Sequence, residues 1–155
     1  MHAHTYPIPI VRALIEDGEG RVLLLKRANT AWGENAWCLP GGKVDCGQTV
    51  AQALAREIFE ETGLTLEAAR LLLVQDSLPL EPGGMHCLNL YFLCRVTGEP
   101  RLNAESAALA WVGQDTMNAY DIAFRNDEAL QRYFSGYSGT AYPFSLDSRE
   151  EHSRA

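Results

Sequence analysis

Three glutamates near the middle of the chain, Glu57, Glu60 and Glu61, have a spacing that brings their carboxylates to one side of a helix. Like charges at such positions repel one another by about 0.2–0.5 kcal/mol per pair, and in the last turn of a helix the dipole also disfavours anions. A divalent cation removes this cost, because clustered carboxylate oxygens are the ligands that Mg²⁺ and Mn²⁺ prefer. The three residues therefore predict a metal site, with a solvated, glutamate-rich helix face as the alternative.

The helix that carries these glutamates is predicted to span residues 49–62, which are rich in good helix formers. Thr49 is suited to cap its start, and Gly63 to end it. An apolar stripe follows its length at four-residue spacing, formed by Val50, Leu54 and Ile58. Directly before the helix, Pro40-Gly41-Gly42 predicts a turn, where a bare backbone can approach a phosphate or help to position metal ligands.

Apolar and β-branched runs predict strands on both sides of this helix. We expect them at residues 8–16, 21–27, 37–39, 69–74, 85–96 and 107–112, with a second helix at 127–134. The first two strands predict one hairpin, and the strands at 69–74 and 85–96 predict another. Hairpins around a single helix differ from the regular strand–helix alternation of a doubly wound sheet. The predicted fold class is therefore α/β, with a mixed sheet covered by helices.

Length and composition predict one domain over residues 1–155, ending in a weakly ordered tail over 135–155. The formal net charge of -7 argues against binding to duplex nucleic acid, which needs clustered basic residues. Nothing approaches the roughly 20 apolar residues that span a bilayer, and the first residues lack the pattern of a signal peptide. We therefore expect a cytoplasmic protein that does not bind membranes.

Gly42 is followed in a fixed register by the run Arg56-Glu57-Ile58-Phe59-Glu60-Glu61-Thr62-Gly63-Leu64. This segment resembles the signature of the Nudix hydrolases, which reads Gly, five residues, Glu, seven residues, then Arg-Glu-apolar-x-Glu-Glu-x-Gly-apolar. The preceding stretch 39–44 is also similar to the family. A match of this length and spacing is highly specific. The resemblance implies the α/β/α sandwich of the Nudix fold, with a mixed β-sheet, over most of the chain.

One position departs from the signature. The sixth residue after Gly42 is Gln48, where the family normally has a glutamate that pairs with the signature arginine or supports the metal cluster. Glutamine keeps the shape and can hydrogen-bond Arg56, but it carries no charge. We expect weaker metal binding or a slower reaction, without a change of reaction class. A low-activity nucleotide-binding or sensing module on the same fold is the alternative.

The resemblance implies a metal-dependent pyrophosphohydrolase that cleaves a phosphoanhydride in a nucleoside di- or triphosphate derivative. Mg²⁺, or alternatively Mn²⁺, is expected at Glu57, Glu60 and Glu61, which are also the predicted catalytic residues. The general base is either one of these glutamates or Glu105, which lies on a later loop. The alternative role for Glu105 is that of an exposed loop acid. Arg56 is expected to orient the acidic cluster from behind the metal ligands.

Four residues are expected to contact the substrate: Arg27, Gly41, Gly42 and Lys43. The planar guanidinium group of Arg27 suits phosphate oxygens, although a surface position at a strand end is equally compatible with its type. Lys43 either contacts phosphate or is solvated. The partner is a small nucleotide-like diphosphate, and a homodimer is left open.

The sequence leaves the identity of the substrate open. Trp32, Tyr120 and Phe124 could stack on a base, although we expect at least two of them to serve packing. Pro79 resembles a marker of family members that cleave ADP-ribose, whereas the stretch 37–43 is also found in members that act on nucleoside triphosphates. An isopentenyl diphosphate isomerase-like activity would need a catalytic Cys and further His ligands, for which the chain has no clear set.

Overall fold

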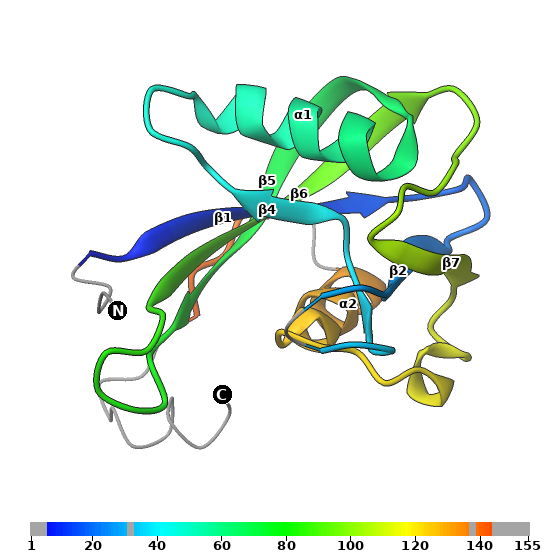
Figure 1. Cartoon of the computed structure of the whole chain (residues 1–155). Coiled ribbons are helices and arrows are strands. Elements are labelled where there is room, and N and C mark those ends of the chain that lie inside the picture. Colours follow the sequence, from blue (N-terminus) through cyan, green and yellow to red (C-terminus); the bar gives the residue numbers. More distant parts are fainter. Residues whose placement is uncertain (1–5, 31–32, 137–138, 144–155) are drawn as a thin grey trace.

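The computed structural model describes residues 6–30, 33–136 and 139–143 (Figure 1). The strands are β1 (Ile8–Ile15), β2 (Val22–Arg27), β3 (Trp37–Cys38), β4 (Gly41–Lys43), β5 (Thr65–Ser77), β6 (Cys87–Thr97) and β7 (Ser106–Val112). The helices are α1 (Val50–Thr62), the short 3-10 helix η1 (Met117–Ala119) and α2 (Asn126–Phe134).

The described strands form two sheets, with the orders β4-β1-β6-β5 and β3-β2-β7. The first sheet is mixed, because β1 is antiparallel to β4 and parallel to β6, whereas the pairs of the second sheet are antiparallel. Helix α1 covers one face of the first sheet, and α2 lies on the opposite side, near β2 (Figure 1). The predicted α/β/α sandwich with a mixed sheet is therefore confirmed, and the second sheet is an addition that was not predicted.

The predicted hairpin of β1 and β2 is wrong. Both edges of β1 are taken, one by β4 and the other by β6, so β2 passes into the second sheet. Among the described residues, the pairing between the two strands is limited to a single antiparallel bridge between Glu16 and Val22. The predicted hairpin of β5 and β6 is confirmed, with β5 longer than expected. The predicted turn at Pro40-Gly41-Gly42 also needs correction, because both glycines belong to β4 and pair with β1.

Local signals fix both ends of α1. The Thr49 side chain accepts a hydrogen bond from the backbone N–H of Gln52 at 3.0 Å, and the Gln52 side chain accepts one from Thr49 at 2.9 Å. This reciprocal capping box satisfies two N–H groups that the helix start leaves unpaired. Gly63 ends the helix with a φ of 73°, a left-handed conformation that glycine adopts without a steric penalty. The glutamates therefore sit on a helix of defined start, end and rotation.

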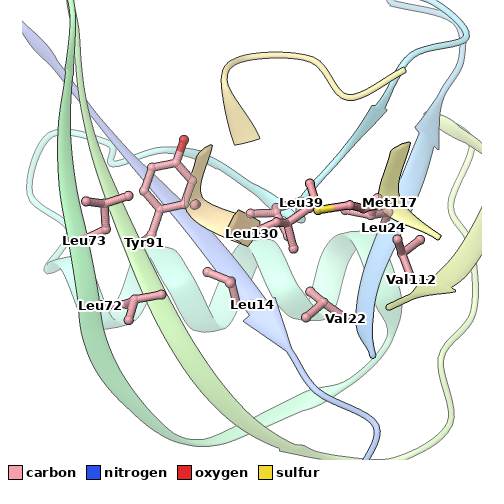
Figure 2. Packing of buried hydrophobic residues seen from close by; sticks show 11 residues of the cluster. Leu14, Val22, Leu24, Leu39, Leu72, Leu73, Tyr91, Val112, Met117 and Leu130 are labelled. Atoms are coloured by element: carbon pink, nitrogen blue, oxygen red, sulfur yellow. The ribbon is translucent and has the colours of Figure 1, made fainter. Parts of the chain in front are cut away.

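Apolar clusters fill both faces of the first sheet. Leu54 and Ile58 of α1 are buried on one face, and the cluster beneath α2 is drawn in Figure 2, with Leu14, Leu72 and Tyr91 facing Leu130. The second cluster contains a polar connection, formed by Tyr91, Asn126 and Gln75. The Tyr91 hydroxyl donates to Gln75 at 3.0 Å and accepts from Asn126 at 3.2 Å. Asn126 also accepts the backbone N–H of Leu39 at 2.9 Å, which ties the start of α2 to the strand that leads into β4.

The described end of the chain runs beside β5. The backbone of Ala141 donates to Leu72 at 3.1 Å and accepts from Val74 at 3.0 Å. The remaining residues of the predicted weakly ordered tail, 137–138 and 144–155, lie outside the described residues. In the described part of the chain, every helix is too short or too polar to cross a bilayer.

Candidate active site

Helix α1 brings Glu57 and Glu61 together against β4. The Glu61 carboxylate accepts a hydrogen bond from the backbone N–H of Gly41 at 3.0 Å. The Glu57 carboxyl group lies so close to Gly42 that a Cβ atom there would come within 2.5 Å of its Oε1. At Gly41 a Cβ atom would overlap the carbonyl oxygen of Val11. Gly42 is therefore needed for the close approach of α1 to β4, and Gly41 for the close approach of β1 to β4. Neither glycine serves the turn that the sequence predicted.

The two carboxyl groups are strongly perturbed by their surroundings. Burial raises the pKa of Glu61 to about 8, and the negative charge of Glu57 adds to this effect, while the Gly41 hydrogen bond and the charge of Arg12 oppose it. Burial also raises the pKa of Glu57, which shares a hydrogen bond with Glu61. Two carboxylates that share one site cannot both ionise without a compensating charge. The pair therefore retains a proton near neutral pH or needs a cation in its place.

Arg56 connects the acidic residues to the loop before the helix. Its guanidinium group lies 3.1 Å from Glu57, 3.7 Å from Glu60 and 3.3 Å from Asp45. It also donates to the carbonyl oxygen of Lys43 at 3.3 Å. These contacts hold the guanidinium group between β4 and α1. The role of Arg56 in orienting the acidic cluster stays a prediction.

The expected contact between Gln48 and Arg56 is absent from the described structure. The Gln48 side chain instead accepts the backbone N–H of Asp45 at 3.0 Å. This bond turns the amide toward its own loop, and the Asp45 carboxylate pairs with Arg56 at 3.3 Å. Asp45 therefore supplies a negative charge beside Arg56 that the sequence analysis did not recognise. The sequence feature that could have indicated this role is the presence of an acidic residue in the same short loop as Gln48.

Glu60 lies apart from the other two glutamates. Its side chain is 53% exposed and contacts Arg56. Within residues 6–30, 33–136 and 139–143, no three His, Cys, Asp or Glu side chains are gathered closely enough to enclose a metal ion. The structure thus brings together two of the three predicted metal ligands, and Glu60 stays a predicted ligand on the same helix.

Glu105 occupies an exposed loop directly before β7. This loop is attached to the end of α1, since Asn103 donates to the Glu60 carbonyl oxygen at 3.1 Å and Arg101 donates to that of Thr62 at 2.7 Å. The Glu105 carboxylate forms no hydrogen bond or ion pair with other described residues. Its role as general base stays a prediction.

The two basic residues that are expected to contact the substrate lie in different environments. Arg27 ends β2 at a β-bulge, and its guanidinium group lies 4.7 Å from the centre of the Phe124 ring. Lys43 ends β4 with an exposed side chain. Of the aromatic candidates, Tyr120 packs edge-on against Trp37 with ring centres 5.0 Å apart, which makes it part of the packing. Trp32 lies outside the described residues.

The chain matches the NUDIX domain family over residues 7–133. It is 34% identical over 136 residues to an ADP-ribose pyrophosphatase of Methanocaldococcus jannaschii, an alignment that covers 88% of this chain and 78% of that protein. It is 31% identical over 131 residues to a human 8-oxo-dGDP phosphatase, covering 79% of this chain and 38% of the human protein.

A solved structure gives the same assignment. The MutT NUDIX hydrolase of Burkholderia pseudomallei superposes with a TM-score of 0.73 at 36% sequence identity, covering 81% of this chain and 97% of that one. The chain therefore belongs to the NUDIX domain family, whose hydrolases act on acid anhydrides in phosphorus-containing compounds.

Proposed function

We propose that this chain is a metal-dependent pyrophosphohydrolase that cleaves the phosphoanhydride of a nucleoside diphosphate derivative. The observation that carries the proposal is the partly buried pair of Glu57 and Glu61, held against β4 by the Gly41 N–H. A structural role does not account for such a pair, because burial and repulsion both oppose its ionisation. Strongly perturbed carboxyl groups of this kind cluster at functional sites, where they bind cations or transfer protons.

The residues at the pair fit a hard divalent cation. Glu57 and Glu61 offer carboxylate oxygens, the donor type that suits Mg²⁺ and Mn²⁺. A bound cation would replace the proton that the two carboxyl groups share in its absence. Glu60 lies one turn from Glu57 on the same helix and is the proposed third ligand. When bound, the cation neutralises phosphate charge and makes water a better nucleophile.

The remaining steps fall to side chains of the chain itself. A carboxylate accepts the proton of the attacking water, with Glu57, Glu61 and Glu105 as the candidates. Arg56 holds Glu57 in place through its 3.1 Å contact. Arg27 and Lys43 bind the phosphates, and Arg27 is suited to this by its planar array of donors.

The substrate is proposed from the relatives, whose names specify ADP-ribose and 8-oxo-dGDP. Both are nucleoside diphosphate compounds, so the shared chemistry is a diphosphate attached to a nucleoside. Pro79, the residue that resembles a marker of ADP-ribose-cleaving members, lies against Gly84 in the connection between β5 and β6. Its position is compatible with a turn and adds no preference between the two compounds.

A panel of ADP-ribose, 8-oxo-dGDP, a nucleotide sugar and nucleoside triphosphates tests the proposal. We expect phosphoanhydride cleavage of at least one diphosphate compound in the presence of Mg²⁺ or Mn²⁺, and none after removal of the metal with a chelator. Phosphorus NMR identifies the products directly. Binding of these nucleotides without turnover of any of them would overturn the proposal. It would favour the alternative that Gln48 suggests, a nucleotide-binding or sensing module on the same fold.

The loop around Gln48 gives a second prediction. Asp45→Asn should lower kcat by at most about fivefold, because an exposed ion pair contributes up to about 1 kcal/mol. Gln48→Glu alone should leave kcat equal or higher, and in the Asp45→Asn background it should restore most of the loss by returning a carboxylate to the loop. Steady-state kinetics of the three variants tests this. A sharp fall in Gln48→Glu alone would contradict it and show that the neutral amide is required.

Three further expectations belong with this proposal. The partner is a small nucleotide-like molecule, and the net charge of -7 disfavours duplex nucleic acid. A cytoplasmic location remains a prediction. Homodimer formation stays open and is measured directly by light scattering.

A further inference from the structure

Helix α2 begins in a way that costs stability. Phe124 and Arg125, the two residues before it, have φ values of 60° and 58°, and a residue other than glycine in this left-handed region costs on the order of 1–3 kcal/mol. The helix start also lacks a side-chain cap, because Arg125 stands at the capping position. Asparagine is a preferred capping residue, but Asn126 lies one position later and is fully buried. The fold therefore maintains a strained helix start that has a buried amide as its first residue.

The side chain of Asn126 is hydrogen-bonded on both sides of its amide. The oxygen accepts the backbone N–H of Leu39 at 2.9 Å. The nitrogen donates to the Tyr91 hydroxyl at 3.2 Å and to the Phe124 carbonyl oxygen at 3.3 Å. These partners determine the orientation of the amide, since a backbone N–H only donates and a backbone carbonyl only accepts. Asn126 therefore connects β6 and the segment before α2 to Leu39 in one geometry.

Leu39 lies where the chain passes from the second sheet to the first, between β3 and β4. Side chains hold both polar groups of its backbone, because Asn126 accepts from its N–H and Arg12 donates to its carbonyl oxygen at 3.2 Å. The strained segment also supports the second contact, since the Arg12 guanidinium carbon lies 5.2 Å from the centre of the Phe124 ring. The Leu39 side chain belongs to the apolar cluster beneath α2 (Figure 2). The segment before α2 therefore determines where the Leu39 backbone lies.

Two residues after Leu39, the backbone reaches the glutamate pair. The Gly41 N–H donates to the Glu61 carboxylate at 3.0 Å, and the ring of Pro40 fixes one backbone angle of the link between Leu39 and Gly41. Strand β4 is short and lies at the edge of its sheet, so it pairs with β1 alone among the described strands. A hydrogen bond weakens steeply when its distance or angle leaves a narrow range. A displaced Leu39 would therefore carry the Gly41 donor away from Glu61.

We propose that Asn126 is a positioning residue for the glutamate pair. Through Leu39 it fixes the start of β4, and with it the Gly41 N–H that holds Glu61 in place for the metal. This inference rests on the proposed function, which assigns Glu61 as a metal ligand. The strain in the two residues before α2 then has a function, because it directs the Asn126 amide into the core. Residues that orient metal ligands change metal affinity or activity about 10–100-fold when they are replaced.

Amide hydrogen exchange followed by NMR measures the Gly41 N–H directly, without metal or substrate. Asn126→Leu has no acceptor for the Leu39 N–H, so the exchange rate at Gly41 relative to that at Leu14 of β1 should rise about tenfold or more. Asn126→Asp keeps an oxygen at the same place and should hold this ratio within about twofold of the unmodified protein. Tyr91→Phe removes the hydroxyl group that orients the amide and should raise the ratio about fivefold.

A control variant, Leu72→Ala, separates this effect from a general loss of stability. Leu72 is a fully buried residue of β5, and its truncation costs about 2–5 kcal/mol, but the exchange ratio of Gly41 to Leu14 should not rise. Mn²⁺ binding, measured by electron paramagnetic resonance without substrate, should weaken about tenfold or more in Asn126→Leu and stay unchanged in Leu72→Ala. With the best substrate of the panel, Asn126→Leu should lower kcat and leave KM within about twofold.

An unchanged exchange ratio in both Asn126→Leu and Tyr91→Phe overturns the positioning role, and if Asn126→Leu does not fold, an unchanged ratio in Tyr91→Phe alone overturns it. An equal rise in Asn126→Leu and Leu72→Ala also overturns it, because Asn126 then only stabilises the core. A changed preference among nucleobases in Asn126→Leu, with Gly41 exchange and Mn²⁺ binding intact, overturns it and assigns Asn126 to base recognition. The expected pattern of exchange and Mn²⁺ binding in a protein that turns over no substrate refutes only the proposed function.

Discussion

Replacing Glu61 with glutamine is expected to lower metal-dependent turnover about a hundredfold or more, with the fold intact. Removing one well-placed electrostatic group from an active site typically has an effect of this order. The amide oxygen of glutamine can still accept the Gly41 N–H, now at 3.0 Å, so the approach of α1 to β4 is preserved. What is lost is the negative charge with which Glu61, together with Glu57, is proposed to bind the cation. Turnover of the best panel substrate at saturating Mg²⁺ measures the effect.

A matched control separates this charge from the acidity of the chain as a whole. Glu99→Gln removes an exposed carboxylate in the turn after β6 and should leave turnover unchanged. Circular dichroism should give the same spectrum for both variants. If Glu61→Gln retained full turnover at every Mg²⁺ concentration, Glu61 would have no part in catalysis or metal binding. A tenfold rise in the Mg²⁺ concentration needed for half activity, with kcat preserved, would assign it to metal binding alone.

The local parts of this site could be predicted because local signals determine them. Thr49 and Gly63 delimit α1 through side-chain capping and a left-handed backbone, both of which depend on residue type and immediate neighbours. The spacing of the glutamates then follows from helix geometry. The approach of a phosphate to Gly41 and Gly42 stays a prediction. Their strand conformation was not predicted, since it arises from pairing with β1, which is distant in sequence.

The contacts between distant segments could not be predicted from the same information. Arg12 interrupts an apolar strand, and the sequence does not reveal that its side chain crosses Gly41 toward Phe124. The failed hairpin of β1 and β2 has the same origin. The turn between the two strands is short, as in a hairpin. However, β4 and β6, which are distant in sequence, occupy the two edges of β1, so β2 cannot pair along it. The pattern of residues predicts where each strand and helix lies. Which strands pair with one another depends on the strand edges that distant segments already occupy.

The metal-free protein is expected to lose stability as pH rises from about 5 to about 8. The pKa of Glu61 is raised from 4.5 in the unfolded chain to about 8 in the folded one, so the folded state binds this proton more tightly. The resulting stabilisation is complete below about pH 4.5 and is lost as pH rises through about 8. The raised pKa of Glu57 acts in the same direction. At about 1.4 kcal/mol per pKa unit, the loss amounts to a few kcal/mol and lowers Tm on the order of 10 °C.

Thermal denaturation from pH 5 to pH 8 in the presence of a chelator measures this loss. Added Mg²⁺ or Mn²⁺ should raise Tm strongly at pH 8 and little at pH 5, because the cation replaces a proton that is already present at the lower pH. In Glu61→Gln the slope should become clearly smaller, since the contribution of Glu61 is lost and only that of the partly buried Glu57 is left. A metal-free Tm that stays constant over this range, or the same slope in Glu61→Gln, would show that the two groups are not held as a proton-sharing pair. The pH dependence therefore tests the basis of the proposed chemistry without requiring that the substrate be known.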